Sequence, residues 1–164
     1  TVRYAQLFKC EQVLRSDCNR GVSGIDGSTS TAAGAACVGE GMTVLITGDM
    51  SFSYDVNGLS STYLSPRFKI IVMCNGGGGI FRFIKPTSDL PELETCFEIH
   101  RDISVEKYAD LFGLRYFELN DEKSAAEVLS LFFAEKDRPA ILVVHTPNVY
   151  NAEVLRGYFR RSRQ

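Results

Sequence analysis

The chain lacks the features that mark a membrane, secreted or nucleic-acid-binding protein. It has no apolar run long enough to span a membrane, and its start does not resemble a signal peptide. Its 18 lysines and arginines are balanced by 20 aspartates and glutamates, so the formal net charge is -2. No excess of basic residues therefore favours nucleic acid. We expect neither a membrane nor a nucleic-acid partner.

The cysteines do not form a recognisable metal or disulfide pattern. There are five of them, an odd number without C-x-x-C spacing: Cys10, Cys18, Cys37, Cys74 and Cys96. This pattern favours reduced thiols in a cytoplasmic protein over a disulfide framework or a zinc site. The two histidines, His100 and His145, have no partner at a ligand spacing, so we assign neither a role.

The length and composition suit one ordinary domain. The chain has 164 residues, of which 45% are hydrophobic, enough for a core of its own. We find no internal repeat and no linker, so we predict that residues 1–164 form a single domain. Because the sequence begins at Thr1 rather than at methionine, we expect this domain to be part of a larger protein.

From residue 43 onward, predicted strands and helices alternate. The strands fall at residues 43–47, 68–73, 116–119 and 140–144, and the helices at residues 55–63, 104–112, 124–134 and 151–160. Ser104 is a plausible N-cap and Gly113 a plausible C-terminal stop for the second helix. Such alternation predicts an α/β fold, a parallel sheet with helices on both faces.

The first 42 residues are less regular. We predict a helix at residues 2–10, a short strand at 12–14, and a helix rich in alanine and glycine at 28–38. Residues 15–31 are polar and rich in glycine, which is typical of a functional loop. Residues 84–97 contain Pro86 and Pro91 without clear periodicity, so we predict a loop there as well.

Two oxygen-bearing side chains follow neighbouring predicted strands. Asp49 comes after the strand at residues 43–47, and Asn75, 26 residues later, follows the next strand and precedes four glycines. In a parallel sheet these ends meet at one edge, where ligands collect. Carboxylate and amide oxygens beside glycine amides suit a magnesium ion that carries a diphosphate. An aspartate alone in this position often only caps the following helix.

Together these residues resemble the Gly-Asp-Gly motif and downstream asparagine of thiamin diphosphate enzymes. The resemblance implies that Asp49, Asn75 and the carbonyl of Gly77 bind Mg²⁺ or Mn²⁺. It also implies that Gly48 and the backbone amides around Met50 and Ser51 lie against the cofactor diphosphate. The chain departs from the motif at Met50, which stands in place of the third glycine, and at Cys74, which precedes the asparagine.

Further blocks resemble one family of these enzymes, the synthases of 2-succinyl-5-enolpyruvyl-6-hydroxy-3-cyclohexene-1-carboxylate (SEPHCHC synthases) of menaquinone biosynthesis. The most specific block is Asn19-Arg20-Gly21-Val22-Ser23-Gly24-Ile25-Asp26-Gly27; others are Gly48-Asp49-Met50-Ser51-Phe52 and Asn75-Gly76-Gly77-Gly78-Gly79-Ile80-Phe81. The resemblance covers most of residues 1–84. Beyond residue 85 it rests on the order of elements alone.

Membership of this family implies a transferase that decarboxylates 2-oxoglutarate and adds the remaining unit to isochorismate, with thiamin diphosphate as cofactor. Arg3 and Arg20 would bind substrate carboxylates, which guanidinium groups pair with in a bidentate way. Ile25 would hold the cofactor in its bent shape, and Ile80 and Phe81 would form an apolar wall beside the reacting atoms. For these three apolar residues, ordinary core packing is the alternative.

Thiamin diphosphate enzymes bind their cofactor between two domains, and this chain resembles only the one that holds the diphosphate and metal. We therefore expect an N-terminal pyrimidine-binding domain of the same protein as partner, across a homodimer interface, and little activity from the chain alone. Two alternatives stay open. One is another member of the cofactor class, such as an acetolactate synthase or 2-oxoacid decarboxylase; the other is a non-catalytic module that binds magnesium diphosphate.

Overall fold

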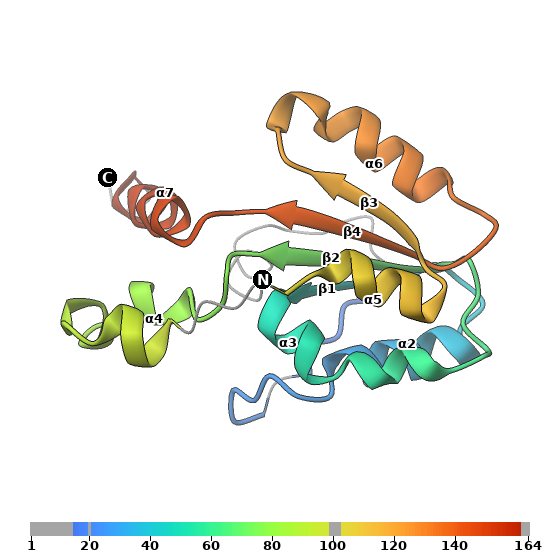
Figure 1. Cartoon of the computed structure of the whole chain (residues 1–164), viewed down its shortest axis with the longest axis horizontal. Helices are drawn as coiled ribbons and strands as arrows, with labels where there is room; N and C mark the ends of the chain where they lie inside the picture. Colours follow the sequence, from blue (N-terminus) through green and yellow to red (C-terminus); the bar gives the residue numbers. More distant parts are fainter. Residues whose placement is uncertain (1–14, 20, 99–102, 162–164) are drawn as a thin grey trace.

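The computed structural model describes residues 15–19, 21–98 and 103–161, and within them it contains a four-stranded parallel sheet (Figure 1). The strands are β1 (Thr43–Gly48), β2 (Phe68–Cys74), β3 (Arg115–Leu119) and β4 (Ala140–His145), in the order β1-β2-β4-β3. All three pairings are parallel. The four strands predicted between residues 43 and 144 are thus confirmed.

The two central strands, β2 and β4, are buried on both faces. Ile70 pairs with Ile141 and Val72 with Val143, and these four side chains pack into one core cluster. Leu142, which alternates with them along β4, belongs to a second cluster on the opposite face. Burial on both faces explains why β2 and β4 read as nearly continuous apolar runs rather than as alternating ones.

Helices cover both faces of the sheet. The helices α2 (Ser28–Val38), α3 (Asp49–Tyr54) and α5 (Val105–Phe112) lie on one face, and α6 (Ala125–Ala134) lies on the other (Figure 1). Ala33, Phe52 and Ala109 bring the first three helices into the larger core cluster. Phe132 of α6 anchors the smaller one. The predicted fold class, a parallel sheet with helices on both faces, is therefore confirmed.

Two helices lie beyond the carboxyl ends of β2 and β4. These are α4 (Ile80–Phe83) and α7 (Asn148–Arg161), which pack against each other (Figure 1). Between α4 and α5 the chain forms a short 3-10 helix (Thr87–Asp89) and a π-helix (Leu93–Phe97), where we predicted only a loop. The fully buried Glu98 binds Arg82 of α4 (Nε to Oε1, 2.8 Å), and this ion pair orders a segment without hydrophobic periodicity.

The helix predicted at residues 55–63 was wrong in its bounds. Helix α3 begins at Asp49, directly after β1, and is followed by a 3-10 helix (Val56–Ser60). The reason lies at Asp55, whose carboxylate accepts hydrogen bonds from the Ser30 amide (2.8 Å) and the Ser30 hydroxyl (2.7 Å). These bonds hold the chain against α2 and interrupt the helix. Asp55 is thus a structural residue that joins α3 to α2.

The ends of α5 follow its capping residues. Ser104 Oγ accepts a hydrogen bond from the Lys107 amide (3.3 Å), and Gly113 has a φ of +69°, so both predicted caps of α5 are confirmed. Helix α7 starts at Asn148, earlier than predicted. The helix and strand predicted at residues 2–10 and 12–14 lie outside the described residues. No helix in the described part of the chain is long and apolar enough to cross a membrane.

The burial of Phe132 predicts how much α6 contributes to the stability of the domain. Its side chain is fully buried and its ring packs edge-on against Phe117, with centroids 5.7 Å apart. We expect Phe132→Ala to lower the free energy of unfolding by about 3–5 kcal/mol, because it leaves a cavity. Leu131→Ala, at a neighbouring side chain that is 55% exposed, should cost less than about 1 kcal/mol. Urea unfolding followed by circular dichroism measures both; equal losses would contradict the observed packing.

Candidate functional site

Asp49 joins the carboxyl ends of β1 and β2. It is the first residue of α3, and its side chain is almost completely buried, with the residue 5% exposed. Its Oδ1 accepts a hydrogen bond from the amide of Met50 (2.8 Å), and its Oδ2 accepts from the amides of Asn75 (3.1 Å) and Gly76 (2.8 Å). A buried carboxylate needs such donors to offset its lost hydration. The structure therefore brings Asp49 and Asn75 together, as the sequence predicts.

The glycine run wraps the chain around this carboxylate. Gly76, Gly77 and Gly78 have φ angles of +84°, +93° and +63°, a region that other residues rarely adopt. The turn lets the Gly77 amide donate to Asn75 Oδ1 (2.9 Å). Three of the four successive glycines are thus a conformational requirement of the loop that follows β2.

Three oxygen atoms of this loop region fit a hard divalent cation. Each of them accepts one hydrogen bond: Asp49 Oδ1 from Met50, Asn75 Oδ1 from Gly77, and the Gly77 carbonyl from Asn148. An oxygen of these types can accept a second interaction. Oxygen ligands of this kind suit Mg²⁺ or Mn²⁺. The described residues hold no group of three or more His, Cys, Asp or Glu side chains that could bind a metal, so an amide and a carbonyl oxygen would have to complete the set.

The loop at residues 15–27 is tied to the same place through Ser51. The Ser51 hydroxyl donates to the Ile25 carbonyl (2.6 Å) and lies 3.4 Å from the hydroxyl of Ser28. The residue Ile25 is 44% exposed, so core packing does not account for it. Ile25 therefore stands on the surface beside the start of α3.

The structure describes the two residues predicted to form an apolar wall, Ile80 and Phe81, but not the two predicted arginines. Ile80 is 37% exposed at the start of α4, whereas the ring of Phe81 packs against Phe97 with centroids 5.4 Å apart. Core packing thus explains Phe81 in part, and Ile80 less well. Arg3 and Arg20 lie outside the described residues. Their roles stay predictions from the sequence.

A pocket of about 490 Å³ opens beside Asp49, at the carboxyl ends of β2, β3 and β4. In it His145 Nε2 lies 2.7 Å from Glu118 Oε1, a contact that lowers the pKa of the Glu118 carboxyl. We found no partner for His145 in the sequence. The pairing of β3 with β4 brings the two side chains together. Glu118 lies beside Val143, and His145 follows two residues later on the same face of the sheet.

The same pocket determines the reactivity of Cys74. Burial, and then the carboxylates of Asp49 and Glu118, raise the pKa of this thiol from 9.0 to about 12. Because the thiolate is the reactive form, we expect iodoacetamide at about pH 8 to leave Cys74 unmodified in the folded protein. Unfolding in urea should return the pKa to its ordinary value and allow alkylation. Peptide mass mapping measures both states, and rapid modification of Cys74 in the folded protein would contradict this environment.

The comparisons with known proteins match this chain along most of its length. Residues 1–144 match the family model described as thiamine pyrophosphate enzyme, C-terminal TPP binding domain. The chain is 48% identical over 159 residues to a 2-succinyl-5-enolpyruvyl-6-hydroxy-3-cyclohexene-1-carboxylate synthase of Porphyromonas gingivalis, which covers 96% of this chain and 28% of that protein. A synthase of the same name from Flavobacterium johnsoniae is 45% identical over 160 residues, 97% of this chain and 29% of that protein.

The chain therefore spans less than a third of the length of these curated relatives. Among solved structures, it is similar to benzoylformate decarboxylase from Polynucleobacter necessarius, with a TM-score of 0.52 and 18% identity over 74% of this chain and 23% of that one. This likeness supports the fold alone. The family is shown by the match over residues 1–144: the chain belongs to the C-terminal TPP-binding domains of thiamine pyrophosphate enzymes.

Proposed function

We propose that the chain is the diphosphate- and metal-binding domain of a SEPHCHC synthase. That enzyme would act as a transferase that decarboxylates 2-oxoglutarate and adds the remaining unit to isochorismate. The observation that carries the proposal is identity of 42–48% to three proteins of that name over nearly the whole chain. The block from Asn19 to Gly27, on which the sequence resemblance depends, supports the same reading.

The residues around Asp49 would hold the cofactor. Thiamin diphosphate, when bound, supplies the electron sink that a decarboxylation requires. Asp49, Asn75 and the Gly77 carbonyl would bind Mg²⁺ or Mn²⁺, and Gly48 would let the backbone approach the diphosphate. The amides of Met50 and Ser51 would face the diphosphate. In this structure the Met50 amide donates to Asp49 Oδ1 and so orients the carboxylate that would bind the metal.

Substrate recognition would fall to two arginines that the sequence resemblance singles out. Arg20 and Arg3 are proposed to bind the carboxylates of 2-oxoglutarate and isochorismate, since guanidinium groups stay charged and pair with carboxylates in a bidentate way. Ile25, Ile80 and Phe81 would exclude water from the reacting atoms. The exposure of Ile25 and Ile80 supports contact with a cofactor or a second domain rather than with this chain's own core.

The site would be completed by another domain. We propose that residues 1–164 form one domain, and that an N-terminal pyrimidine-binding domain of the same protein closes the cofactor site across a homodimer interface. The small share of the relatives that this chain covers supports this arrangement. The described cysteines, Cys18, Cys37, Cys74 and Cys96, are all free, which supports a reducing, cytoplasmic location.

The proposal predicts a specific pattern of CO2 release. With thiamin diphosphate and Mg²⁺, the full-length protein should release CO2 from 2-oxoglutarate and form a joined product only when isochorismate is present. The 164-residue chain alone should give little or no turnover, because it holds half of the site. Radiolabelled CO2 capture and mass spectrometry of the product measure both.

Other outcomes of this assay select between the alternatives. Release from pyruvate instead of 2-oxoglutarate would place the protein with acetolactate synthases or 2-oxoacid decarboxylases. No release from either substrate, with retained cofactor binding, would leave a non-catalytic magnesium-diphosphate module. Appreciable turnover by the isolated chain would contradict the proposed second domain.

A further inference from the structure

The first residue of α7 reaches back to the glycine loop. Asn148 is 6% exposed, and its Nδ2 donates to the Gly77 carbonyl (2.9 Å), a contact between residues 71 positions apart. Its other amide atom, Oδ1, is buried and has no hydrogen-bond partner among the described residues. A buried acceptor without a hydrogen-bond partner destabilises the fold, so this atom needs an explanation.

Gly79 shows what the unpaired oxygen faces. A Cβ atom at this position would collide with Asn148 Oδ1 and would lie 2.8 Å from Asn75 Nδ2. The two amide groups therefore face the same small space, which exists because residue 79 has no side chain. Gly79 has φ -55° and ψ -22°, an ordinary helical conformation, so glycine is required here for space and not for backbone strain.

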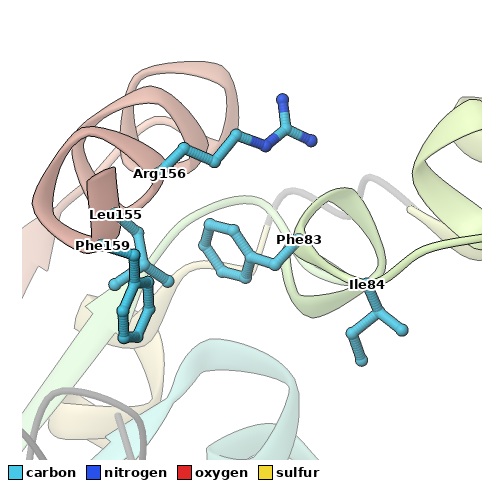
Figure 2. A pocket seen from close by; sticks show the side chains of 5 residues that line it. All are labelled: Phe83, Ile84, Leu155, Arg156 and Phe159. Atoms are coloured by element: carbon cyan, nitrogen blue, oxygen red, sulfur yellow. The ribbon is translucent and has the colours of Figure 1, made fainter. Parts of the chain in front are cut away.

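Helix α7 gives Asn148 a fixed support. Arg156 Nη2 donates to the Arg82 carbonyl of α4 (2.6 Å). The ring of Phe83 points toward Leu155 and Phe159 of α7, around a pocket of about 130 Å³ (Figure 2). Helix α7 thus packs against α4 through residues about two turns after Asn148. A side chain held in this way can position the groups that it touches.

We propose that Asn148 is a positioning residue for the metal site, through both ends of its amide group. This inference rests on the proposed function, in which Asn75 Oδ1 and the Gly77 carbonyl are metal ligands. Nδ2 fixes the direction of the Gly77 carbonyl. Oδ1 has no hydrogen-bond partner among the described residues but borders the same space as Asn75 Nδ2. A hydrogen bond from Asn75 Nδ2 to this oxygen in the metal-bound protein would set the direction of Asn75 Oδ1, because both Asn75 atoms belong to one planar amide.

The first test removes the amide from Asn148 in the full-length protein. Asn148→Leu should raise the dissociation constant for Mn²⁺, measured by electron paramagnetic resonance with thiamin diphosphate present, by about 10–100-fold, the usual effect of losing an outer-shell partner. Asn151→Leu is the matched control, because Asn151 Nδ2 also donates to a backbone carbonyl at the start of α7, that of Thr146 (2.7 Å), away from the glycine loop. A shift below twofold in folded Asn148→Leu, or equal shifts in both variants, would overturn the proposal.

The second test fills the space at Gly79 and keeps the Asn148 amide. Gly79→Ala should weaken Mn²⁺ binding by a similar factor, because the added methyl group separates the two amides. Gly157→Ala is its control, since a Cβ at Gly157 meets no atom within 4 Å. Should Asn148→Leu fail to fold, as judged by circular dichroism, Gly79→Ala decides alone: unchanged Mn²⁺ binding would refute the proposal.

Asp49→Ala separates this inference from the proposed function. If Asp49→Ala abolishes Mn²⁺ binding while Asn148→Leu and Gly79→Ala keep it, the metal site stands and the positioning role of Asn148 is refuted. If Asp49→Ala also binds Mn²⁺ like the unaltered protein, the proposed metal site itself fails. Loss in all three variants, with both controls unchanged, supports the site and the role of Asn148.

Discussion

The buried carboxylate of Asp49 is the constraint on which the rest of the site depends. It accepts hydrogen bonds from the amide of Met50, which follows β1, and from the amides of Asn75 and Gly76, which follow β2, so the two strands cannot end independently of each other. The two hydrogen bonds from Asn75 and Gly76 also set the direction of peptide groups at the start of the glycine loop. Replacing the carboxylate would leave backbone donors buried without partners, which is costly in any protein.

The sheet explains why the buried Asp49 carboxylate lies at the carboxyl ends of the strands. β2 and β4 are covered on both faces, so their only accessible places are their ends. At the carboxyl ends the chain leaves β2 into the glycine loop and leaves β4 into α7, and Asn148 joins the two exits. The Arg82–Glu98 ion pair joins α4 to the segment that follows it. The glycine loop, α4 and α7 are thus connected to one another at the carboxyl ends of β2 and β4.

Local signals in the sequence were sufficient for the strands, for the fold class and for the pairing of Asp49 with Asn75. Each of these depends on periodicity or on a residue that directly follows a strand. Contacts between distant segments gave no such signal: nothing near Asn148 indicates that it reaches Gly77, and nothing near Asp55 indicates Ser30. The segment between α4 and α5 was read as a loop because it lacks hydrophobic periodicity. A buried ion pair and isolated apolar contacts, such as that of Phe97 with Phe81, order it instead.

The positive φ angles of Gly76, Gly77 and Gly78 also have a thermodynamic consequence. Glycine loses more backbone conformational entropy on ordering than any other residue, so a run of three makes this loop expensive to fix. A hydrogen bond from the Gly76 amide to Asp49 Oδ2 and one from Asn148 Nδ2 to the Gly77 carbonyl fix it. That entropy loss therefore belongs to the folding of the domain, and a ligand that arrives at the sheet edge meets a loop that is already ordered.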